Sequence, residues 1–292
     1  MLIGKNPLNE APDWFVKNIE NRPEECSVSV NGAEIKYFVW GDRSKKPLLL
    51  LHGYNAHSHW WDHIAPALTE SHCVVALDFS GMGESARREE YSQEIFVEDV
   101  KGVIDDLAWS ACTCIAHSMG GSIATLATST YPDFFEHLIL LDSMIVIPPN
   151  VAERMASNRP SARMVVASPD LETAMARFRL TPPQPCKDYV LRHIAETSYV
   201  EKSDGWHLKS DPLIPNTYKY NDLHDSFTKI NCELDYVYGQ ASQLVTKEVL
   251  EYMTYVGNMD EKNIHCLSGA MHHLFLDMPE EFIALIKDLI TK

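Results

Sequence analysis

The chain has 292 residues, of which 45% are hydrophobic and 23% are charged, so it can bury a large core and is no disordered chain. Its 41 acidic and 25 basic residues give a net charge of −16, which argues against nucleic acid and anionic membranes as partners. The length fits one large α/β domain, or such a domain with an insertion.

The seven cysteines are odd in number and lack the spacing of a metal site. Cys112 and Cys114 lie two positions apart in an apparent strand, so their side chains should share one face. We interpret the cysteines as reduced core residues. Residues 1–15 contain no long apolar run, and no segment approaches the ~18 apolar residues of a membrane span. We therefore expect a cytoplasmic protein without a signal peptide.

The first half of the chain predicts strands that alternate with helices. Residues 27–41 alternate between polar and apolar side chains around Asn31-Gly32, which predicts a β-hairpin. Ser92 precedes an amphipathic helical pattern that ends near Trp109. Continuous apolar runs, typical of strands buried on both faces, occupy residues 47–53, 73–81, 112–118 and 137–143.

This rhythm breaks after Ser143 and returns near the end of the chain. Residues 144–225 are rich in proline and predict helices and loops, which we interpret as an inserted helical cap. Strands are then expected at residues 233–239 and 263–269, each followed by a helix. Alternating strands and helices predict right-handed crossovers and a mostly parallel, doubly wound sheet. The core would comprise residues 1–143 and 226–292.

Ser118 stands at an abrupt junction between a predicted strand and a predicted helix, in Ala116-His117-Ser118-Met119-Gly120. A serine on such a tight turn projects its hydroxyl out of the sheet, and small flanking residues such as Gly120 avoid crowding. The turn also leaves the amide of Met119 at a helix N-terminus, where it can bind a developing oxyanion. The alternative is an ordinary serine cap of a helix.

A serine nucleophile needs a second oxyanion donor and a base. The amide of Tyr54 can be that donor, because Gly53 ends a buried strand and allows close backbone approach. Of the 13 histidines, His272 and His273 follow the last predicted strand and are the candidate bases. The first loop also contains histidines that we interpret as lining or surface residues, namely His57, His59 and His63.

The order and spacing of four motifs resemble the α/β-hydrolase superfamily. They are "LHG" ending at Gly53, "LDFSGMGES" from Leu77, the Ser118 turn, and "HHLFLDMPEEF" from His272. The resemblance covers nearly the whole core and implies an eight-stranded sheet and a nucleophilic Ser118. It favours His272 over His273 as the base, because Asp277 and Pro279 follow in the usual positions. A serine at this turn argues against the dehalogenases and epoxide hydrolases of the superfamily, which have aspartate there.

The catalytic acid is not where the resemblance places it. The loop after the seventh strand usually ends in an acid, but this chain has Ser242 there, and Asp235 lies in the middle of a strand. Some members of the superfamily take the acid from the end of the sixth strand, which here is Asp142. We therefore expect the triad Ser118, Asp142 and His272, with little part for Ser242. The alternative for Asp142 is a cap at the entry to the insertion.

The expected function is hydrolysis of small apolar carboxylic esters through an acyl-enzyme, without a metal or an organic cofactor. A C–C bond hydrolase, a lactonase or a thioesterase would share the triad, and a ligand-binding homologue with a weak triad is the alternative from another class. The chain could form a homodimer. The apolar residues of the insertion suit an acyl or aryl group or form its own core: Met144, Met155, Met164, Met175, Phe178, Leu180, Tyr189 and Trp206.

Overall fold

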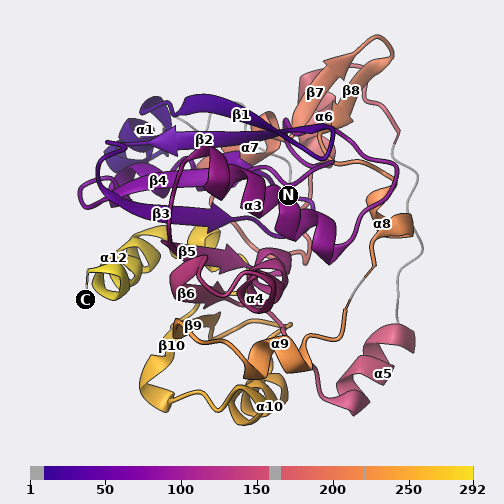
Figure 1. Ribbon diagram of the computed structural model, residues 1–292. Helices are drawn as coiled ribbons and strands as arrows, with labels where there is room; N and C mark the ends of the chain where they lie inside the picture. Colours follow the sequence, from indigo (N-terminus) through magenta and orange to yellow (C-terminus); the bar gives the residue numbers. More distant parts are fainter. Residues whose placement is uncertain (1–9, 158–165, 220, 292) are drawn as a thin grey trace.

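A computed structural model of the chain describes residues 10–157, 166–219 and 221–291 (Figure 1). Its centre is an eight-stranded sheet in the order β1-β2-β4-β3-β5-β6-β9-β10. The pairs β1–β2 and β2–β4 are antiparallel, and all later pairs are parallel, as the alternating pattern predicts. The strands are β1 (Glu24–Val30), β2 (Ala33–Trp40), β3 (Lys46–Leu51), β4 (His72–Leu77), β5 (Cys112–His117), β6 (Phe135–Leu141), β9 (Glu233–Gly239) and β10 (Ile264–Leu267).

Helices cover both faces of this sheet, because alternate residues of its central strands face opposite cores. In β3, Leu49 and Leu51 join one hydrophobic core, and Leu48 and Leu50 join the other. The first core contains residues of α3 (Gln93–Asp106), α4 (Met119–Thr130), α9 (His224–Thr228) and α10 (Lys247–Gly257). The second contains residues of α1 (Asp13–Glu20), η2 (Ser58–Trp61), α2 (Ala65–Leu68), α11 (Leu274–Asp277) and α12 (Pro279–Ile290).

Local sequence signals explain where several elements begin and end. Asn31 and Gly32 both have positive φ, 48° and 81°, as the tight turn between β1 and β2 requires. Ser92 caps α3 by accepting a hydrogen bond from the Ile95 amide at 3.3 Å. A short 3-10 helix, η3 (Glu261–Asn263), leads into β10.

The insertion after β6 is not wholly helical. Beside its helices it contains a hairpin of β7 (Tyr199–Lys202) and β8 (Gly205–Leu208), which projects at the upper right in Figure 1. The prediction of helix and loop was therefore wrong for residues 199–202 and 205–208. Met164 lies outside the described residues. The helices are α5 (Pro149–Ser157), α6 (Leu171–Arg177), α7 (Asp188–Thr197) and α8 (Ile214–Thr217).

Helix α7 packs the insertion against α1 and the segment that follows η2. His193 bonds to Asp62 through Nε2 and Oδ2 at 2.9 Å, and the ring of Tyr189 packs edge-on against Phe15 at 4.8 Å. Met175 and Leu180 are buried in the same core as α12. These side chains therefore join a core shared with α1 and α12 and hold the insertion in place, rather than forming a core of the insertion alone.

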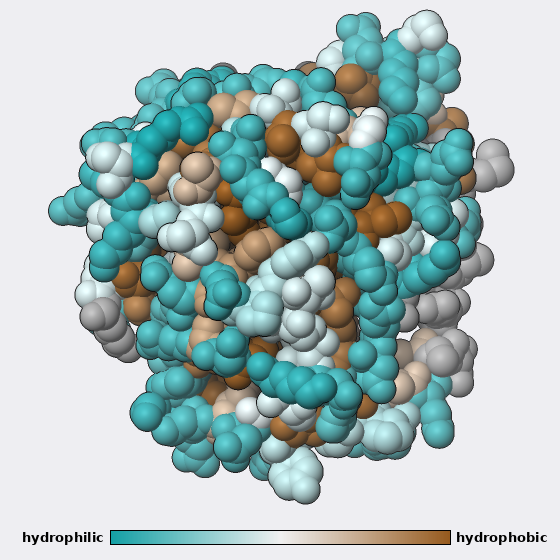
Figure 2. All heavy atoms as spheres, viewed as in Figure 1, coloured by the Kyte–Doolittle hydropathy of each residue, from teal (hydrophilic) through white to brown (hydrophobic). Residues whose placement is uncertain are grey.

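The visible face of the molecule is mostly hydrophilic, and the cysteines differ in how deeply they are buried. Hydrophilic side chains cover most of the face in Figure 2, and apolar ones appear between them in small groups. Cys112 and Cys114 are fully buried in the same core, and all seven cysteines are free thiols. Their interpretation as core residues was nevertheless wrong for four of them, because Cys266 is exposed and Cys26, Cys186 and Cys232 are only partly buried. Over the described ranges, no helix combines the length and the apolar character needed to cross a membrane.

Candidate active site

Ser118 lies between β5 and α4 in a strained backbone conformation, with φ 53° and ψ −116°. Residues other than glycine rarely adopt positive φ, so the surrounding structure must enforce this turn. The Ser118 amide donates to the carbonyl of Leu141 at 3.0 Å, and its carbonyl accepts from Gly121 at 3.0 Å. Its side chain makes no capping bond, so the interpretation as an ordinary helix cap receives no support.

Two glycines let the backbone around Ser118 pack closely. A Cβ on Gly120 would lie 2.7 Å from the carbonyl oxygen of His52, so α4 could not approach β3 with any larger residue. A Cβ on Gly53 would lie 3.2 Å from the Ser118 Cβ, so the loop that carries Tyr54 passes directly beside the serine. Among the described residues the amide of Met119 has no hydrogen-bond partner, as befits the first turn of a helix.

His272 and Asp142 form a buried pair at the same edge of the sheet. His272 Nδ1 lies 2.8 Å from Asp142 Oδ2, and both side chains are almost fully excluded from solvent. Asp142 follows β6 with a positive φ of 45°, which aspartate tolerates better than most residues. The hydrogen bonds of the described residues include none between the Ser118 hydroxyl and His272, and such bonds often tighten only when substrate is bound.

Ser242 contacts Asp142 directly, a role that its position in the sequence did not indicate. Its hydroxyl donates to Asp142 Oδ2 at 2.6 Å, and the Gly239 amide donates to Asp142 Oδ1 at 3.0 Å. The Ser242 oxygen in turn accepts from the amides of Leu244 and Val245. The residue at the usual acid position therefore supports a carboxylate that comes from the neighbouring strand.

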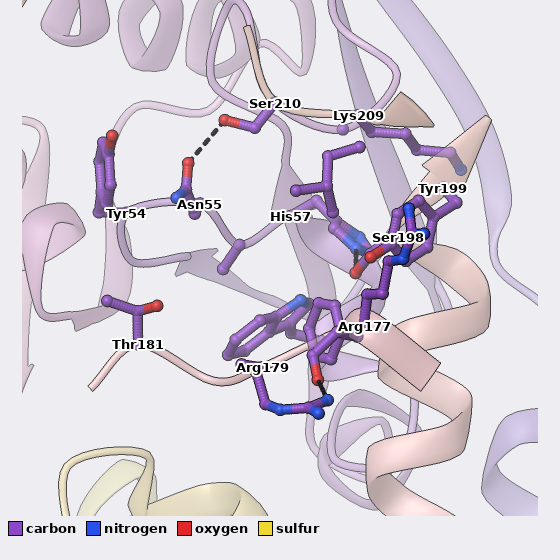
Figure 3. A pocket seen from close by; sticks show the side chains of 15 residues that line it. Tyr54, Asn55, His57, Arg177, Arg179, Thr181, Ser198, Tyr199, Lys209 and Ser210 are labelled. Atoms are coloured by element: carbon purple, nitrogen blue, oxygen red, sulfur yellow. Dashed lines mark hydrogen bonds between the residues drawn. The ribbon is translucent and has the colours of Figure 1, made fainter. Parts of the chain in front are cut away.

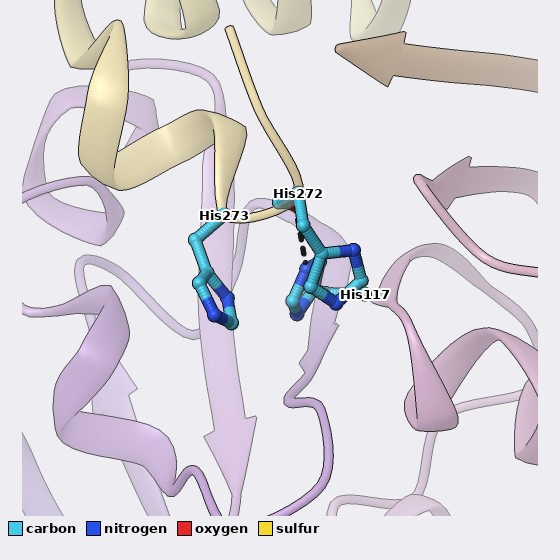
Figure 4. Close-up of side chains that lie close together, drawn as sticks. All are labelled: His117, His272 and His273. Atoms are coloured by element: carbon cyan, nitrogen blue, oxygen red, sulfur yellow. Dashed lines mark hydrogen bonds between the residues drawn. The ribbon is translucent and has the colours of Figure 1, made fainter. Parts of the chain in front are cut away.

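His273 has surroundings very different from those of His272. Its ring lies against the rings of His117 and His272, with centroids at 5.4 and 4.8 Å (Figure 4), and against Trp60 at 5.3 Å. Both of its ring nitrogens are buried, and neither makes a hydrogen bond within the described residues. Burial, helped by the charge of His272, lowers the pKa of His273 to about 3. A packing role therefore fits His273 better than a role as base.

The remaining candidates from the sequence lie outside the reacting centre. Asp277 accepts the Met271 amide at 2.7 Å and so braces the loop before His272. Asp235 points away from His272 and accepts bonds from His137 and His265 at 2.8 and 2.6 Å. Burial opposes ionisation of Asp235, but these two bonds outweigh it and lower its pKa.

Two groups of described side chains bring potential metal ligands within 4.8 Å of one another. One is His117, His272 and His273 (Figure 4), and the other is formed by His137, Glu233 and Asp235. In the first group His117 Nε2 already bonds the carbonyl of His272 at 3.0 Å, and His272 Nδ1 bonds Asp142. In the second group His137 Nε2 already bonds Asp235 Oδ2 at 2.8 Å.

A pocket of about 210 Å³ opens beside this centre, between the first loop and the insertion (Figure 3). Tyr54 lines it and adjoins Gly53, and Trp60 lines it and contacts His273. Sequence reasoning missed most of its residues, because they come from the first loop, the loop after β4 and the insertion, which only the folded chain brings together. Its other lining residues are Asn55, Ala56, His57, Gly83, Arg177, Phe178, Arg179, Thr181, Ser198, Tyr199, Leu208, Lys209 and Ser210.

Residues 46–256, more than half of the chain, match the family model described as the alpha/beta hydrolase fold. A serine hydrolase-like protein of Danio rerio is 33% identical over 138 residues, which cover 46% of this chain and 42% of that protein. Epoxide hydrolase 4 of Mus musculus is 36% identical over 122 residues, which cover 40% and 34%. The chain thus spans less than half of the length of either relative.

Solved structures resemble the whole chain at low sequence identity. A thioesterase domain from the curacin biosynthetic pathway has a TM-score of 0.75 and 23% identity, over 91% of this chain and all of that one. E-2-(acetamidomethylene)succinate hydrolase has a TM-score of 0.78 and 19% identity, over 92% and 100%. An esterase from Mycobacterium tuberculosis has 0.73 and 22%, over 97% and 99%. At these identities the likeness establishes the fold alone.

Proposed function

Because the chain belongs to the alpha/beta hydrolase fold family, we propose that it is a serine hydrolase that cleaves carboxylic esters through an acyl-enzyme intermediate. The observation that carries this proposal is the 2.8 Å contact between His272 Nδ1 and Asp142 Oδ2, next to the strained Ser118 turn. Buried imidazole–carboxylate pairs of this kind orient a general base and stabilise its charged form.

In the proposed reaction Ser118 attacks the ester carbonyl while His272 Nε2 takes the proton of the hydroxyl. Because Nδ1 faces Asp142, the neutral ring carries its proton there, which leaves Nε2 free to accept. The amides of Met119 and Tyr54 would hold the oxyanion. His272 then gives the proton to the leaving alcohol, and water, activated by the same ring, releases the acid from Ser118.

Two features favour a small ester with an apolar acyl or aryl part. The pocket presents Trp60 and Phe178 as walls, and its volume of about 210 Å³ suits a small group. A thioester, a lactone or a C–C bond next to a carbonyl would use the same groups. The serine at position 118 favours these acyl-transfer reactions over the epoxide opening that the name of one relative suggests.

The first experiment is labelling with a fluorophosphonate probe, with peptide mass spectrometry to locate the adduct and para-nitrophenyl butyrate to measure turnover. We expect an adduct on Ser118, and Ser118→Ala should lose on the order of 10⁶ in kcat. His272→Ala should abolish labelling, whereas His273→Ala should retain it. A wild-type protein that neither labels nor turns over esters, yet is stabilised by a ligand, would instead be a binding homologue.

A further inference from the structure

The pocket beside Ser118 has a cationic lining, which is unusual in a chain with a net charge of −16. Arg177, Arg179 and Lys209 line it, and its lining includes no aspartate or glutamate. The general field of the protein repels anions, so an anion would be attracted here only by these local groups. The pocket therefore differs in charge from the surface around it.

The two guanidinium groups lack carboxylate partners among the described residues. Arg177 donates to the Ser168 hydroxyl at 3.2 Å, and Arg179 donates to the carbonyls of Ala176 and Phe178 at 2.8 and 2.6 Å. By contrast, Lys209 is paired with Glu84. Arg177 and Arg179 thus keep donors for a planar anion such as a carboxylate.

Both arginines act on the same part of the pocket. Burial raises the pKa of the Tyr199 phenol, while the charges of Arg177 and Arg179 both oppose that rise. In Figure 3 the side chains of Arg177, Ser198 and Tyr199 lie together on the cap side of the pocket. Positive potential is therefore concentrated at one end of the pocket.

His57 also lines this pocket, and one of its buried ring nitrogens has no hydrogen-bond partner among the described residues. The Ser198 hydroxyl donates its only hydrogen to the carbonyl of Ile194 at 2.6 Å, so it accepts from His57 Nε2 at 2.9 Å. Burial keeps the ring neutral by lowering its pKa, so Nδ1 is a bare acceptor with no bond.

The pocket also adjoins the reacting centre, through Tyr54 and Trp60. Tyr54 lines the pocket, and a Cβ on its neighbour Gly53 would lie 3.2 Å from the Ser118 Cβ. Trp60 lines the pocket and packs on His273, next to His272. A substrate with its carbonyl at Ser118 can therefore extend past the aromatic wall to the arginines.

We propose that this pocket binds a free carboxylate of the substrate through Arg177 and Arg179, so that the preferred esters carry a second, ionised acid group. This rests on the proposed esterase activity and names its substrate class. The apolar part of the substrate lies against Trp60 and Phe178, and the charged end lies at the cap. Specificity then resides in the end of α6 and the residues just after it rather than in the triad.

The test compares matched substrates that differ only in the remote charge. For an acyl-side carboxylate the pair is the para-nitrophenyl half-ester of glutarate and para-nitrophenyl valerate; for an alcohol-side carboxylate it is 3-acetoxybenzoate and phenyl acetate. In at least one pair the charged ester should have a kcat/KM about tenfold higher, mainly through KM, as one exposed charge-assisted bond would give. Arg177→Gln combined with Arg179→Gln should remove that preference.

Arg192→Gln is the matched control, because this cap arginine is paired with Glu172 at 3.0 Å and does not line the pocket. It should leave the preference unchanged. Equal ratios in wild type and the double variant, for both pairs, would overturn the proposal while leaving the esterase activity intact. If no ester turns over, thermal stabilisation by glutarate that the double variant loses still supports the carboxylate site, and its absence overturns it.

Discussion

At the scale of single residues, the site depends on how Asp142 is held. Its carboxylate accepts hydrogen bonds from Ser242, the Gly239 amide and His272, so both of its oxygens are held in place by donors. A carboxylate that is fixed this firmly can hold the neutral His272 ring in one tautomer and stabilise its charged form in the proposed reaction. The serine at position 242 contributes to this even though it cannot replace the acid.

The proximity of Asp142 and Ser242 leads to a prediction about the proposed catalytic acid. Asp142→Asn should lower kcat by roughly 10⁴, because an amide can hold the wrong tautomer of the base. The Ser242 hydroxyl is 2.6 Å from Asp142 Oδ2, so a carboxylate at position 242 can reach His272. Asp142→Asn with Ser242→Asp should therefore recover at least ~100-fold of kcat, measured with para-nitrophenyl butyrate.

Ser242→Ala is the control for that swap. It removes one hydrogen bond to the acid and should lower kcat by no more than about tenfold. Wild-type turnover in Asp142→Asn would contradict the assignment of the acid. Failure of the swap in a folded protein would show that position 242 cannot present a carboxylate to the ring.

The residues of the proposed triad could be located from the sequence, because each follows a predicted strand in a short motif. Ser118 stands in a Gly-rich turn, Asp142 ends an apolar run, and His272 precedes Asp277. The part played by Ser242 could not, because it depends on a contact between residues 100 positions apart. The pocket arginines were missed for the same reason, since their meaning depends on how the cap packs on the first loop.

At the scale of elements, the position of the nucleophile depends on the contact between α4 and β3. A Cβ at Gly120 would meet the backbone oxygens of His52 and Leu51 at 2.7 and 2.9 Å. Backbone atoms in a buried strand cannot move aside, so the helix itself would have to shift. The strained Ser118 turn begins that helix and would shift with it.

Gly120→Ala should therefore reduce activity and stability together. We expect a loss on the order of 1–3 kcal/mol in the free energy of unfolding, as for overpacking in a core, measured by urea denaturation. Fluorophosphonate labelling of the folded fraction should also slow. Ser122→Ala, in the same helix, is the control and should change stability by less than about 0.5 kcal/mol. Labelling at the wild-type rate in Gly120→Ala would contradict this account of the turn.

The strands of the sheet were predictable and the cap hairpin was not, for one physical reason. A parallel strand covered on both faces is a continuous apolar run, which β3, β4 and β5 all display. β7 and β8 are only partly buried, so their sequences carry no such run. The signal that could have found them is the polar Ser203-Asp204-Gly205 turn, where Gly205 has φ 124°.

At the scale of the whole molecule, many histidines are buried in neutral form. Burial lowers the pKa of His52, His57 and His117, and it lowers that of His63 to about 4 and of His273 to about 3. His59 is an exception: burial opposes its charged form, but the bond and the charge of Asp62 raise its pKa. Burial therefore favours the uncharged form of most of these histidines, so their protonation favours the unfolded state.

This predicts loss of stability in weak acid. In the unfolded chain His63 titrates near pH 6.5, so between pH 6.5 and about 4 the unfolded state binds more protons than the folded state. Stability from His63 is thus present above pH 6.5 and is lost as the pH falls toward 4, by an amount on the order of 3 kcal/mol. The free energy of unfolding, measured in urea at several pH values, should fall over this range.

His63→Gln tests whether this histidine carries its share of the slope. Glutamine can still donate to the carbonyl of Phe275, which His63 Nε2 reaches at 3.1 Å, but it does not titrate. The variant should therefore be less stable than wild type at pH 7 through poorer packing, and its stability should fall less steeply between pH 6.5 and 4. His224→Gln, at a half-exposed position, should follow the wild-type slope. Parallel slopes for His63→Gln and wild type would show that the buried ring takes up its proton without unfolding, because the core around it admits water.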